Sequence, residues 1–476
     1  MTSADAPRPG TPDHPLRVAV IGSGPAGFYV VQELLQSAGL QAEVDMFDRL
    51  PTPFGLVRSG VAPDHPKIKS VANLYDRLAS KPGYRFFGNV EFGRDVDLED
   101  LTRHYGQIVF ASGAQADRAL DIPGEDLTGV HSARHFVAWY NGDPDYSHLH
   151  FDFEAKAAAV VGVGNVAADV ARILCRAHSR LAQTDIADYA LDALHASSIQ
   201  TVYVLGRRGP VQSRFSPPEI KELGELLDCA ASTLPEEMEL DPFSREELEQ
   251  GPREVRQKYD ELLAMAGREE PQKPKKLIIR FMASPVEILG DGEGRVRGIR
   301  IVRNELYRAD DGTVRSRATD HEETLDVGLV FRSVGYRGVS LPGLPFDRQR
   351  GVVPNEAGRI IDPESNLALP GLYVSGWIKR GPTGLIGANK GCARETVQCM
   401  VHDLEQGRLL RPDDDHRGSI ERLLEERNVR YLTYEDWKRL DEIERQRGEA
   451  EGRPRVKITE REEMLRAIER DSARKR

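Results

Sequence analysis

The chain has 476 residues, of which 39% are hydrophobic and 30% charged, and its net charge is -11 at pH 7. This length predicts two or more domains, and the acidic balance argues against nucleic acid as the main partner. No run of about 18 apolar residues occurs, so we expect no helix inserted in a membrane.

The N-terminus and the cysteines both favour a cytoplasmic protein. Residues 1–15 are polar and proline-rich, without the apolar core of a secretory signal or the Arg-rich helix of a transit peptide, and we expect a disordered tail there. The four cysteines, at positions 175, 229, 392 and 399, form no C-x-x-C pair. We therefore expect no disulfide framework and no metal site, and sparse cysteines suit a reducing compartment.

The first predicted unit is a strand over 17–21, a helix over 27–36 and a second strand over 42–47. A G-x-G-x-x-G motif at 22–27 joins the strand to the helix, where glycines permit a tight turn and the close approach of a pyrophosphate. Asp48 follows the second strand, where a carboxylate accepts hydrogen bonds from ribose hydroxyls and repels a 2′-phosphate. This context favours a site for FAD or NAD over a loop without a ligand.

A second unit repeats this design with different charges. A strand over 157–161 leads into G-x-G-x-x-A at 162–167 and a helix over 165–176, and after a helical insert at 181–194 the partner strand follows at 201–205. Arg207 and Arg208 then stand where the acid would be, and two guanidinium groups can bind a 2′-phosphate. Two surface arginines on a loop are the plainer reading, but their place favours NADPH, and the two sites together imply hydride flow from NADPH to a resident flavin.

Other glycine-rich strand ends are expected beside the same cofactors. The strands at 105–113 and 329–335 end in small residues, and we interpret them as crossings between a flavin domain and an inserted NADPH domain. A third strand, over 371–376, precedes Trp377 and a glycine-rich turn at 381–387. We expect Trp377 to lie near the flavin or the nicotinamide rather than only in the core.

The alternation of strands and helices predicts an α/β fold with two Rossmann-like dinucleotide-binding domains. We expect surface helices and loops over 230–275, strands over 277–302, and terminal helices at 419–427 and 434–442. The predicted domains are a discontinuous FAD-binding domain, 16–116 and 339–476, and an NADPH-binding domain, 117–338.

Three longer motifs make the chain resemble the adrenodoxin reductase family, which includes bacterial ferredoxin–NADP reductases. They are L-P-T-P-F-G-L-V-R-S-G-V-A-P-D-H-P-K-I-K at 50–69, G-R-R-G-P-V-Q at 206–212 and G-W-I-K-R-G-P-T-G at 376–384. The resemblance covers about residues 17 to 405. It implies an NADPH–ferredoxin oxidoreductase that passes hydride to bound FAD and then single electrons to a ferredoxin-type iron–sulfur protein.

The glycine motifs and the resemblance together assign residues to two cofactor sites. The candidate FAD-binding residues are Gly22, Gly24, Pro25, Ala26, Gly27, Asp48, Leu56, Val90, Trp377, Gly384, Leu385 and Ile386. The candidate NADPH-binding residues are Arg118, Gly164, Asn165, Val166, Ala167, Arg207, Arg208, Glu219 and Gly384. Asp48 is shorter than the glutamate usual in the family, which reduces its reach toward the ribose.

His65 and Glu222 correspond in the family to a polar pair near the nicotinamide, and they are the candidate catalytic residues. By itself, His65 could equally be a turn histidine in a proline-rich loop. We expect it to position and tune the site, because hydride transfer needs no protein base, although its neutral pKa would let it buffer a flavin proton.

The expected partner is a ferredoxin or a flavodoxin, and the chain is expected to be a monomer. Ferredoxins are generally acidic, so a basic docking patch is expected despite the net charge, and the candidate run is Lys273, Lys275, Lys276 and Arg280. A solvated charged face explains the same run.

Other protein classes share parts of this pattern. A glutamate-synthase small-subunit type has a similar layout, but cysteine cluster ligands are expected near its N-terminus, and here no cysteine precedes Cys175. A disulfide reductase needs a redox cysteine pair beside the flavin, whereas Cys392 and Cys399 lie on a predicted helix and are expected in the core. A flavin-bearing interaction protein that binds a partner through residues 405–476 stays open.

Overall fold

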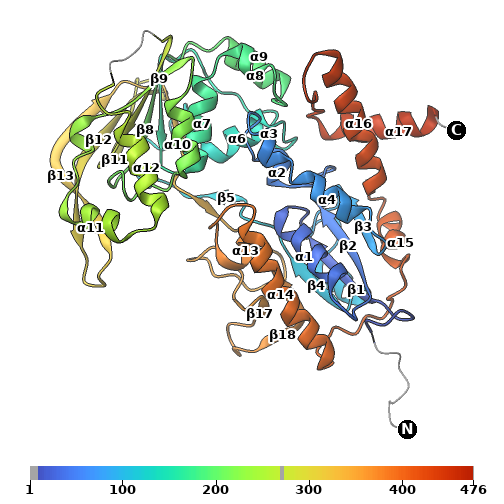
Figure 1. Ribbon diagram of the computed structural model, residues 1–476. Helices are drawn as coiled ribbons and strands as arrows, with labels where there is room; N and C mark the ends of the chain where they lie inside the picture. The colour runs from blue at the N-terminus through green and yellow to red at the C-terminus, as the bar shows by residue number, and fades with distance from the viewer. Residues whose placement is uncertain (1–8, 269–272, 475–476) are drawn as a thin grey trace.

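The computed structural model describes residues 9–268 and 273–474, and it divides into two lobes that lie side by side (Figure 1). One lobe contains the N-terminal segment, blue in the figure, together with the orange and red C-terminal segments. The green and yellow middle of the chain forms the other lobe.

The first lobe is built on a seven-stranded sheet with the order β16-β17-β18-β4-β1-β2-β3. Its strands are β1 (Leu16–Ile21), β2 (Ala42–Asp48), β3 (Tyr84–Gly88), β4 (Gln107–Phe110), β16 (Asn355–Glu356), β17 (Arg359–Ile361) and β18 (Ala368–Val374). Its helices are α1 (Pro25–Gln36), α2 (Leu56–Ser59), α3 (Pro66–Lys69), α4 (Ala72–Ala79), α5 (Leu98–His104), α13 (Trp377–Arg380) and α14 (Ala388–Glu405). Because strand side chains alternate, Val18 and Val20 of β1 enter one apolar core and Ala19 and Ile21 enter another, so both faces of the sheet are covered.

The second lobe is built on a six-stranded parallel sheet with the order β6-β14-β7-β8-β10-β9. Its strands are β6 (Val130–Ser132), β7 (Ala157–Val161), β8 (Thr201–Leu205), β9 (Cys229–Thr233), β10 (Lys275–Arg280) and β14 (Leu329–Arg332). Its helices are α6 (Ala133–Tyr140), α7 (Asn165–Cys175), α8 (His178–Leu181), α9 (Asp188–His195), α10 (Pro217–Gly224), the 3₁₀ helix η1 (Pro235–Glu237), α11 (Pro242–Gln250) and α12 (Arg253–Leu263). A three-stranded antiparallel sheet, β11 (Ala283–Gly290), β12 (Val296–Arg308) and β13 (Val314–Leu325), covers the other side of this lobe.

Two short strands join the lobes. β5 (Ala116–Asp117) and β15 (Tyr336–Arg337) pair antiparallel, with Tyr336 opposite Asp117. The two crossings of the chain therefore lie together near the predicted boundaries at 116/117 and 338/339. The boundaries themselves stay a prediction.

The C-terminal segment contacts both lobes. It contains α15 (Ser419–Glu426), α16 (Tyr434–Ala450) and α17 (Arg461–Arg474), the last of which the sequence did not predict. Between α16 and α17, Lys457 Nζ donates to the Asn141 carbonyl at 2.9 Å. Arg461, the first residue of α17, donates through Nη1 to the Arg49 carbonyl at 2.6 Å. This segment thus bridges α6 of the second lobe and the end of β2 in the first.

Several expectations about local structure were wrong. The insert at 181–194 is not one helix, because buried Asp185 lies in the break between α8 and α9 and pairs with Lys69 Nζ at 2.6 Å. The region 230–275 begins with strand β9, whose sequence C-A-A-S-T is rich in small residues and carries a weak strand signal. Cys392 and Cys399 of α14 are both half-buried, although Cys399 still packs against the core of the first lobe.

The predicted disordered tail is corrected in part. Residues 1–8 of it lie outside the described residues. Gly10, however, is buried, and its carbonyl accepts a hydrogen bond from Gln41 N at 2.9 Å, which fixes residues 9–15 beside β2. Over 9–268 and 273–474, no helix combines the length and the apolar character needed to cross a bilayer.

Candidate functional site: two nucleotide loops

The first glycine loop requires its glycines for two separate reasons. Gly22 has φ +108°, and a Cβ on it would lie 2.6 Å from the Ala111 carbonyl oxygen. A Cβ on Gly27 would lie only 2.1 Å from the Gly22 carbonyl oxygen, so helix α1 can approach β1 only with glycine there. Gly24, in contrast, has no atom within 4 Å of an added Cβ. The loop is therefore tight on its protein side and open at Gly24.

Helix α1 begins at this open position without a side-chain cap. Gly24 is the N-cap residue and Pro25 is the first helical residue. The first-turn N–H groups consequently have no side-chain acceptor, which leaves them for an anion.

Asp48 ties the loop to the end of β2. One carboxylate oxygen accepts hydrogen bonds from Ser23 N at 2.8 Å and Ser23 Oγ at 2.5 Å, and the other accepts from Leu50 N at 2.9 Å. The acid is thus held at the edge of the glycine loop by three donors. The position matches the expected ribose acceptor, although its contact with a ribose stays a prediction.

Three further segments meet at the first loop. A Cβ on Gly55 would lie 2.8 Å from Gly24 Cα, and one on Gly376 would lie 2.4 Å from Ala26 Cβ. Val90 is buried, and its N–H donates to the Asp48 carbonyl at 2.9 Å. The structure therefore brings the candidate FAD residues on β2, on α2 and after β3 to the glycine loop.

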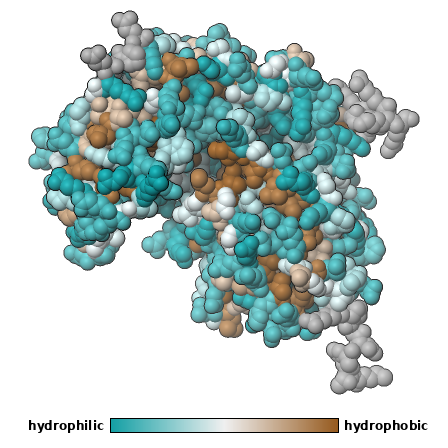
Figure 2. Space-filling view, viewed as in Figure 1, coloured by the Kyte–Doolittle hydropathy of each residue, from teal (hydrophilic) through white to brown (hydrophobic). Residues whose placement is uncertain are grey.

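Trp377 begins α13 directly after Gly376. Its Nε1 donates to the Thr383 carbonyl at 3.2 Å, which draws the turn containing Gly384, Leu385 and Ile386 toward the same place. Leu385 is 68% exposed and Leu56 is 40% exposed, so both present apolar surface. Figure 2 shows apolar surface gathered in the hollow between the two lobes.

The second glycine loop has the same backbone design with looser packing at its third position. Gly162 has φ +135°, and a Cβ on it would lie 2.2 Å from the Ser333 carbonyl oxygen. At the third position Ala167 is fully buried, so this helix leaves room for a methyl group. Helix α7 begins at Gly164 with no side-chain cap, and Asn165 Oδ1 accepts from Ser216 N at 2.8 Å. Val166 follows in the first turn of the helix.

Positive charge gathers beside this second loop. Arg207 is exposed and Arg208 half-buried, and in the described part of the chain neither guanidinium donates to a carboxylate. The pKa of Arg208 is lowered by burial and by the nearby charges of Arg207 and Arg214. Three cations that repel one another suit a multiply charged anion.

Arg214 is a residue that sequence reasoning missed. Its N–H donates to the Val163 carbonyl at 2.7 Å, and it pairs with Gly164, so the chain returns to the loop after passing Arg207 and Arg208. The sequence carries no signal for it beyond a third arginine near the G-R-R motif. The return of the backbone brings it to the site.

His65 and Glu222 form the predicted polar pair, with His65 Nε2 and Glu222 Oε2 2.8 Å apart. Burial alone would lower the pKa of His65, but the bond to Glu222 and the charge of Asp169 raise it overall. The pKa of Glu222 is lowered, because its bond to His65 and the charge of Arg172 outweigh burial.

A buried arginine organises the surroundings of this pair. Arg172 of α7 is fully buried, and its guanidinium bonds Asp64 at 2.8 Å, Asp169 at 2.6 Å and Glu219 at 3.1 Å. Burial raises the pKa of Asp169 to about 6, against the attraction of Arg172. The sequence did not reveal Arg172, Asp64 or Asp169. The only available signal was the i, i+3 spacing of two opposite charges on a helix with apolar neighbours.

The segment from Phe54 to His65 connects the two loops. At one end the Phe54 N–H donates to the Ser23 carbonyl at 3.0 Å, and at the other end His65 contacts α7 and α10. A second link is formed by Tyr336 and Trp377, whose ring centroids lie 5.7 Å apart. Arg118 is exposed beside it, where its N–H donates to the Gly335 carbonyl at 3.1 Å. The first glycine loop is therefore linked through this segment to the helices α7 and α10 of the second lobe.

Three of the four cations in the predicted basic docking run are bonded within the second lobe. Lys273 and Lys275 donate to backbone carbonyls of Leu226 at 2.5 Å and Leu174 at 2.6 Å. Arg280 is paired with Glu237 and Glu323, each at 2.8 Å. These three cations stabilise the second lobe internally, whereas Lys276 is exposed, so a docking role for the run stays a prediction.

Comparisons with known proteins find relatives over nearly the whole chain. Residues 16–223 match the pyridine nucleotide-disulphide oxidoreductase family. The chain is 43% identical over 460 residues to NADPH-ferredoxin reductase FprA of Mycobacterium tuberculosis, covering 95% of this chain and 99% of that protein. It is 40% identical over 466 residues to the mitochondrial NADPH:adrenodoxin oxidoreductase of Homo sapiens, covering 95% of this chain and 92% of that protein. The solved structure of the M. tuberculosis FprA in complex with NADPH superimposes with a TM-score of 0.90 at 42% identity, covering 96% of this chain and all of the other.

Proposed function

The chain belongs to the adrenodoxin reductase family, and on that basis we propose that it is an NADPH–ferredoxin oxidoreductase that holds FAD at the first glycine loop. The observation that carries the proposal is the contrast between the two loops. One is flanked by a hydrogen-bonded acid, Asp48, and the other by Arg207, Arg208 and Arg214, none of which forms an ion pair with a carboxylate of the described residues.

The residues of the first loop fit FAD. Gly24 leaves open space where a pyrophosphate would approach, and the uncapped N-terminus of α1 supplies donors for it. Asp48 would accept hydrogen bonds from the ribose, while Leu56, Trp377 and Leu385 would cover the apolar isoalloxazine. Bound FAD supplies an acceptor for hydride and a donor of single electrons.

The second loop would bind NADPH as the substrate. Arg207 and Arg208 would hold the 2′-phosphate, Arg214 would add a third positive charge, and α7 would face the pyrophosphate. Arg118 would contact the nucleotide from beside the β5–β15 pair that joins the lobes, and Glu219 would contact it from α10.

His65 and Glu222 would orient the nicotinamide end of NADPH. Their mutual hydrogen bond fixes the imidazole ring, and Arg172 holds the surrounding carboxylates in place. Because hydride carries its own electron pair, no protein base is required, and these residues would bind and position.

The electron acceptor would be a ferredoxin-type iron–sulfur protein, and the reaction would take place in the cytoplasm. The relatives are named for ferredoxin and adrenodoxin, which supports this class of partner.

Anaerobic mixing of the FAD-loaded protein with NADPH or NADH tests the proposal. We expect NADPH to bleach the flavin absorbance at far lower concentration than NADH, and a ferredoxin to accelerate NADPH-driven reduction of cytochrome c. A protein that retains no flavin, or whose flavin NADPH leaves oxidised, would refute the assignment.

A further inference from the structure

The loop that carries Arg207 and Arg208 is held in place by the junction between β10 and β11 and by β12. The Gly206 N–H donates to the Arg280 carbonyl and the Ala283 N–H to the Gly206 carbonyl, both at 2.9 Å. The Arg208 carbonyl accepts from Met282 N at 3.1 Å. Between them, the Arg207 carbonyl accepts from a side chain, the Nδ2 of Asn304, at 2.7 Å.

Asn304 is an exception within its strand. The neighbouring buried residues of β12 are apolar, namely Ile299, Ile301, Val302 and Leu306, whereas Asn304 is a polar side chain only 4% exposed. Burying an amide is unfavourable unless its donors are bonded. Here both Nδ2 hydrogens have acceptors, since Ser284 Oγ lies 2.7 Å away on the adjacent strand.

The backbone around Asn304 is shaped for this contact. The pairing of β12 with β13 shifts register between Val302 and Asn304. Asn304 N donates to the Met282 carbonyl at 2.6 Å, and Met282 has φ +53°, a conformation that residues other than glycine rarely adopt. Such a conformation is unfavourable and is found where the surrounding structure requires it.

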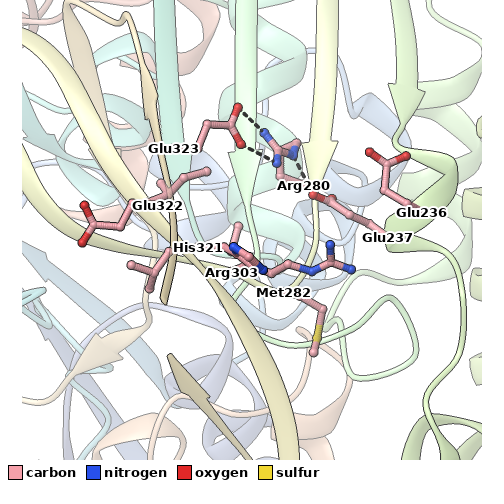
Figure 3. Close-up of a pocket in the computed structure, with 11 residues that line it drawn as sticks. Glu236, Glu237, Arg280, Met282, Arg303, His321, Glu322 and Glu323 are labelled. Atoms are coloured by element: carbon pink, nitrogen blue, oxygen red, sulfur yellow. Dashed lines mark hydrogen bonds and ion pairs between the residues drawn. The ribbon is translucent and has the colours of Figure 1, made fainter. Parts of the chain in front are cut away.

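The junction between β10 and β11, which contacts the arginine loop, is itself held by ion pairs. Figure 3 shows Arg280 between Glu323 of β13 and Glu237 of η1, in a cavity of about 370 Å³ that Met282 and Arg303 also line. Glu237 in addition accepts from the Phe281 N–H at 2.6 Å. The junction between β10 and β11 is therefore held by ion pairs, and the Arg207–Arg208 loop rests on it.

Without a bound anion, electrostatic repulsion favours separation of the three arginine side chains beside this loop. Burial and the nearby like charges of Arg207 and Arg214 lower the pKa of Arg208, against the attraction of Glu247. Fixing the Arg207 carbonyl fixes the backbone of this residue and so restricts the positions that its guanidinium can reach. A preorganised pair of arginines binds an anion more tightly than a mobile pair.

We propose that Asn304 is a positioning residue that holds Arg207 and thereby sets the preference of this site for a 2′-phosphorylated dinucleotide. The inference rests on the proposed function and deepens it. It concerns a residue that would not touch the nucleotide.

The test compares Asn304→Asp with the unmodified FAD-loaded protein by calorimetry, using 2′,5′-ADP and ADP as probes. Aspartate has the same shape but cannot donate, so it would repel the Arg207 carbonyl oxygen. We expect binding of 2′,5′-ADP to weaken about tenfold. Binding of ADP should change little. In steady state the KM for NADPH should rise by the same factor while kcat is retained.

Two variants serve as controls. Ser284→Ala removes the second acceptor of Asn304 but keeps the bond to Arg207, and Glu305→Gln changes the next, exposed residue of the strand, which pairs with Arg317 across the hairpin. Both should leave the ratio of the two affinities unchanged. Should Asn304→Asp fail to fold, Asn304→Ala removes the same donor without adding charge.

The outcomes separate the two proposals. An unmodified protein that prefers 2′,5′-ADP, with a folded Asn304 variant that keeps the same preference, would overturn the role of Asn304 alone. An unmodified protein that binds both probes equally would overturn the NADPH assignment and the role of Asn304 with it.

Discussion

The two glycine loops share one backbone design, but they differ in their packing and in whether the charged side chains beside them already have bonding partners in the protein. At the first loop, Asp48 already has three hydrogen-bond donors, and Gly27 lies so close to Gly22 that no side chain fits. At the second loop, Ala167 is accommodated, and Arg207 and Arg208 have no carboxylate partner in the described residues.

This difference indicates how each site would treat its nucleotide. A loop whose flanking carboxylate is already hydrogen-bonded and whose protein side is tightly packed suits a cofactor that stays bound. At a loop flanked by cations, a bound anion reduces the repulsion between them, which suits a substrate that binds and leaves. The same motif can therefore serve two purposes because its flanking residues differ.

The largest expected effect comes from exchanging the third positions of the loops. Gly27→Ala places a methyl group against a backbone carbonyl that cannot move aside, and we expect it to destabilise folding by about 3 kcal/mol or more and to abolish FAD binding. Ala167→Gly only removes a methyl group within a helix, at a cost of about 1 kcal/mol. Urea unfolding of both variants measures the contrast. Equal losses would contradict the difference in packing between the loops.

The next effect concerns the charge of the second loop. Arg207→Ala combined with Arg208→Ala removes two charge-assisted interactions, and we expect the KM for NADPH to rise about 100-fold. The KM for NADH should change less than about twofold, because NADH has no 2′-phosphate. Initial rates measured over a range of NADPH and NADH concentrations give the two KM values.

A matched control is Arg253→Ala with Arg256→Ala, which removes the same charge from exposed positions of α12. It should leave both constants unchanged. If the two double variants behaved alike, general charge rather than the clamp would explain the effect.

A smaller effect is expected from Asp48→Asn at the first loop. Asparagine has one acceptor oxygen and cannot serve both Ser23 and Leu50, so we expect FAD to bind about tenfold more weakly. Titration of the flavin-free protein with FAD measures this, and 2′,5′-ADP binding should be unaltered. Glu43→Gln, at the far end of the same strand, is the control.

The smallest effect should be the pH dependence of stability. The pKa of His65 is raised, chiefly through Glu222 against the effect of burial, so its contribution is complete below the unfolded value of about 6.5 and is lost as pH rises through the folded pKa. The pKa of Glu222 is lowered, so its contribution is present above its unfolded value of about 4.3 and is lost as pH falls through the folded pKa.

The pair therefore stabilises the protein most in the mildly acidic window between these limits. His65→Gln should flatten the fall in unfolding free energy from about pH 6 to about pH 9, and Glu222→Gln should act in the same direction. Urea unfolding at both pH values measures the slope. A slope that neither variant changes would show that the pair is uncoupled from folding.

The parts of the fold that were predictable have strong local causes. The first β-α-β unit could be predicted because an apolar strand, a glycine turn and an uncapped helix follow one another within about 30 residues. Strand β9 could not, because its small residues have low strand preference and only its pairing with β10 makes it a strand. The break near Asp185 depends on Lys69, more than a hundred residues away.

By itself, the sequence determined the two nucleotide loops and the sign of the charge beside each, since these follow from residues adjacent in the chain. The tertiary structure alone decided that Arg214 joins Arg207 and Arg208, that Arg172 gathers Asp64, Asp169 and Glu219, and that Asn304 bonds the Arg207 carbonyl. Those contacts join residues distant in sequence, and buried polar groups find partners through the path of the folded backbone, which no local pattern records.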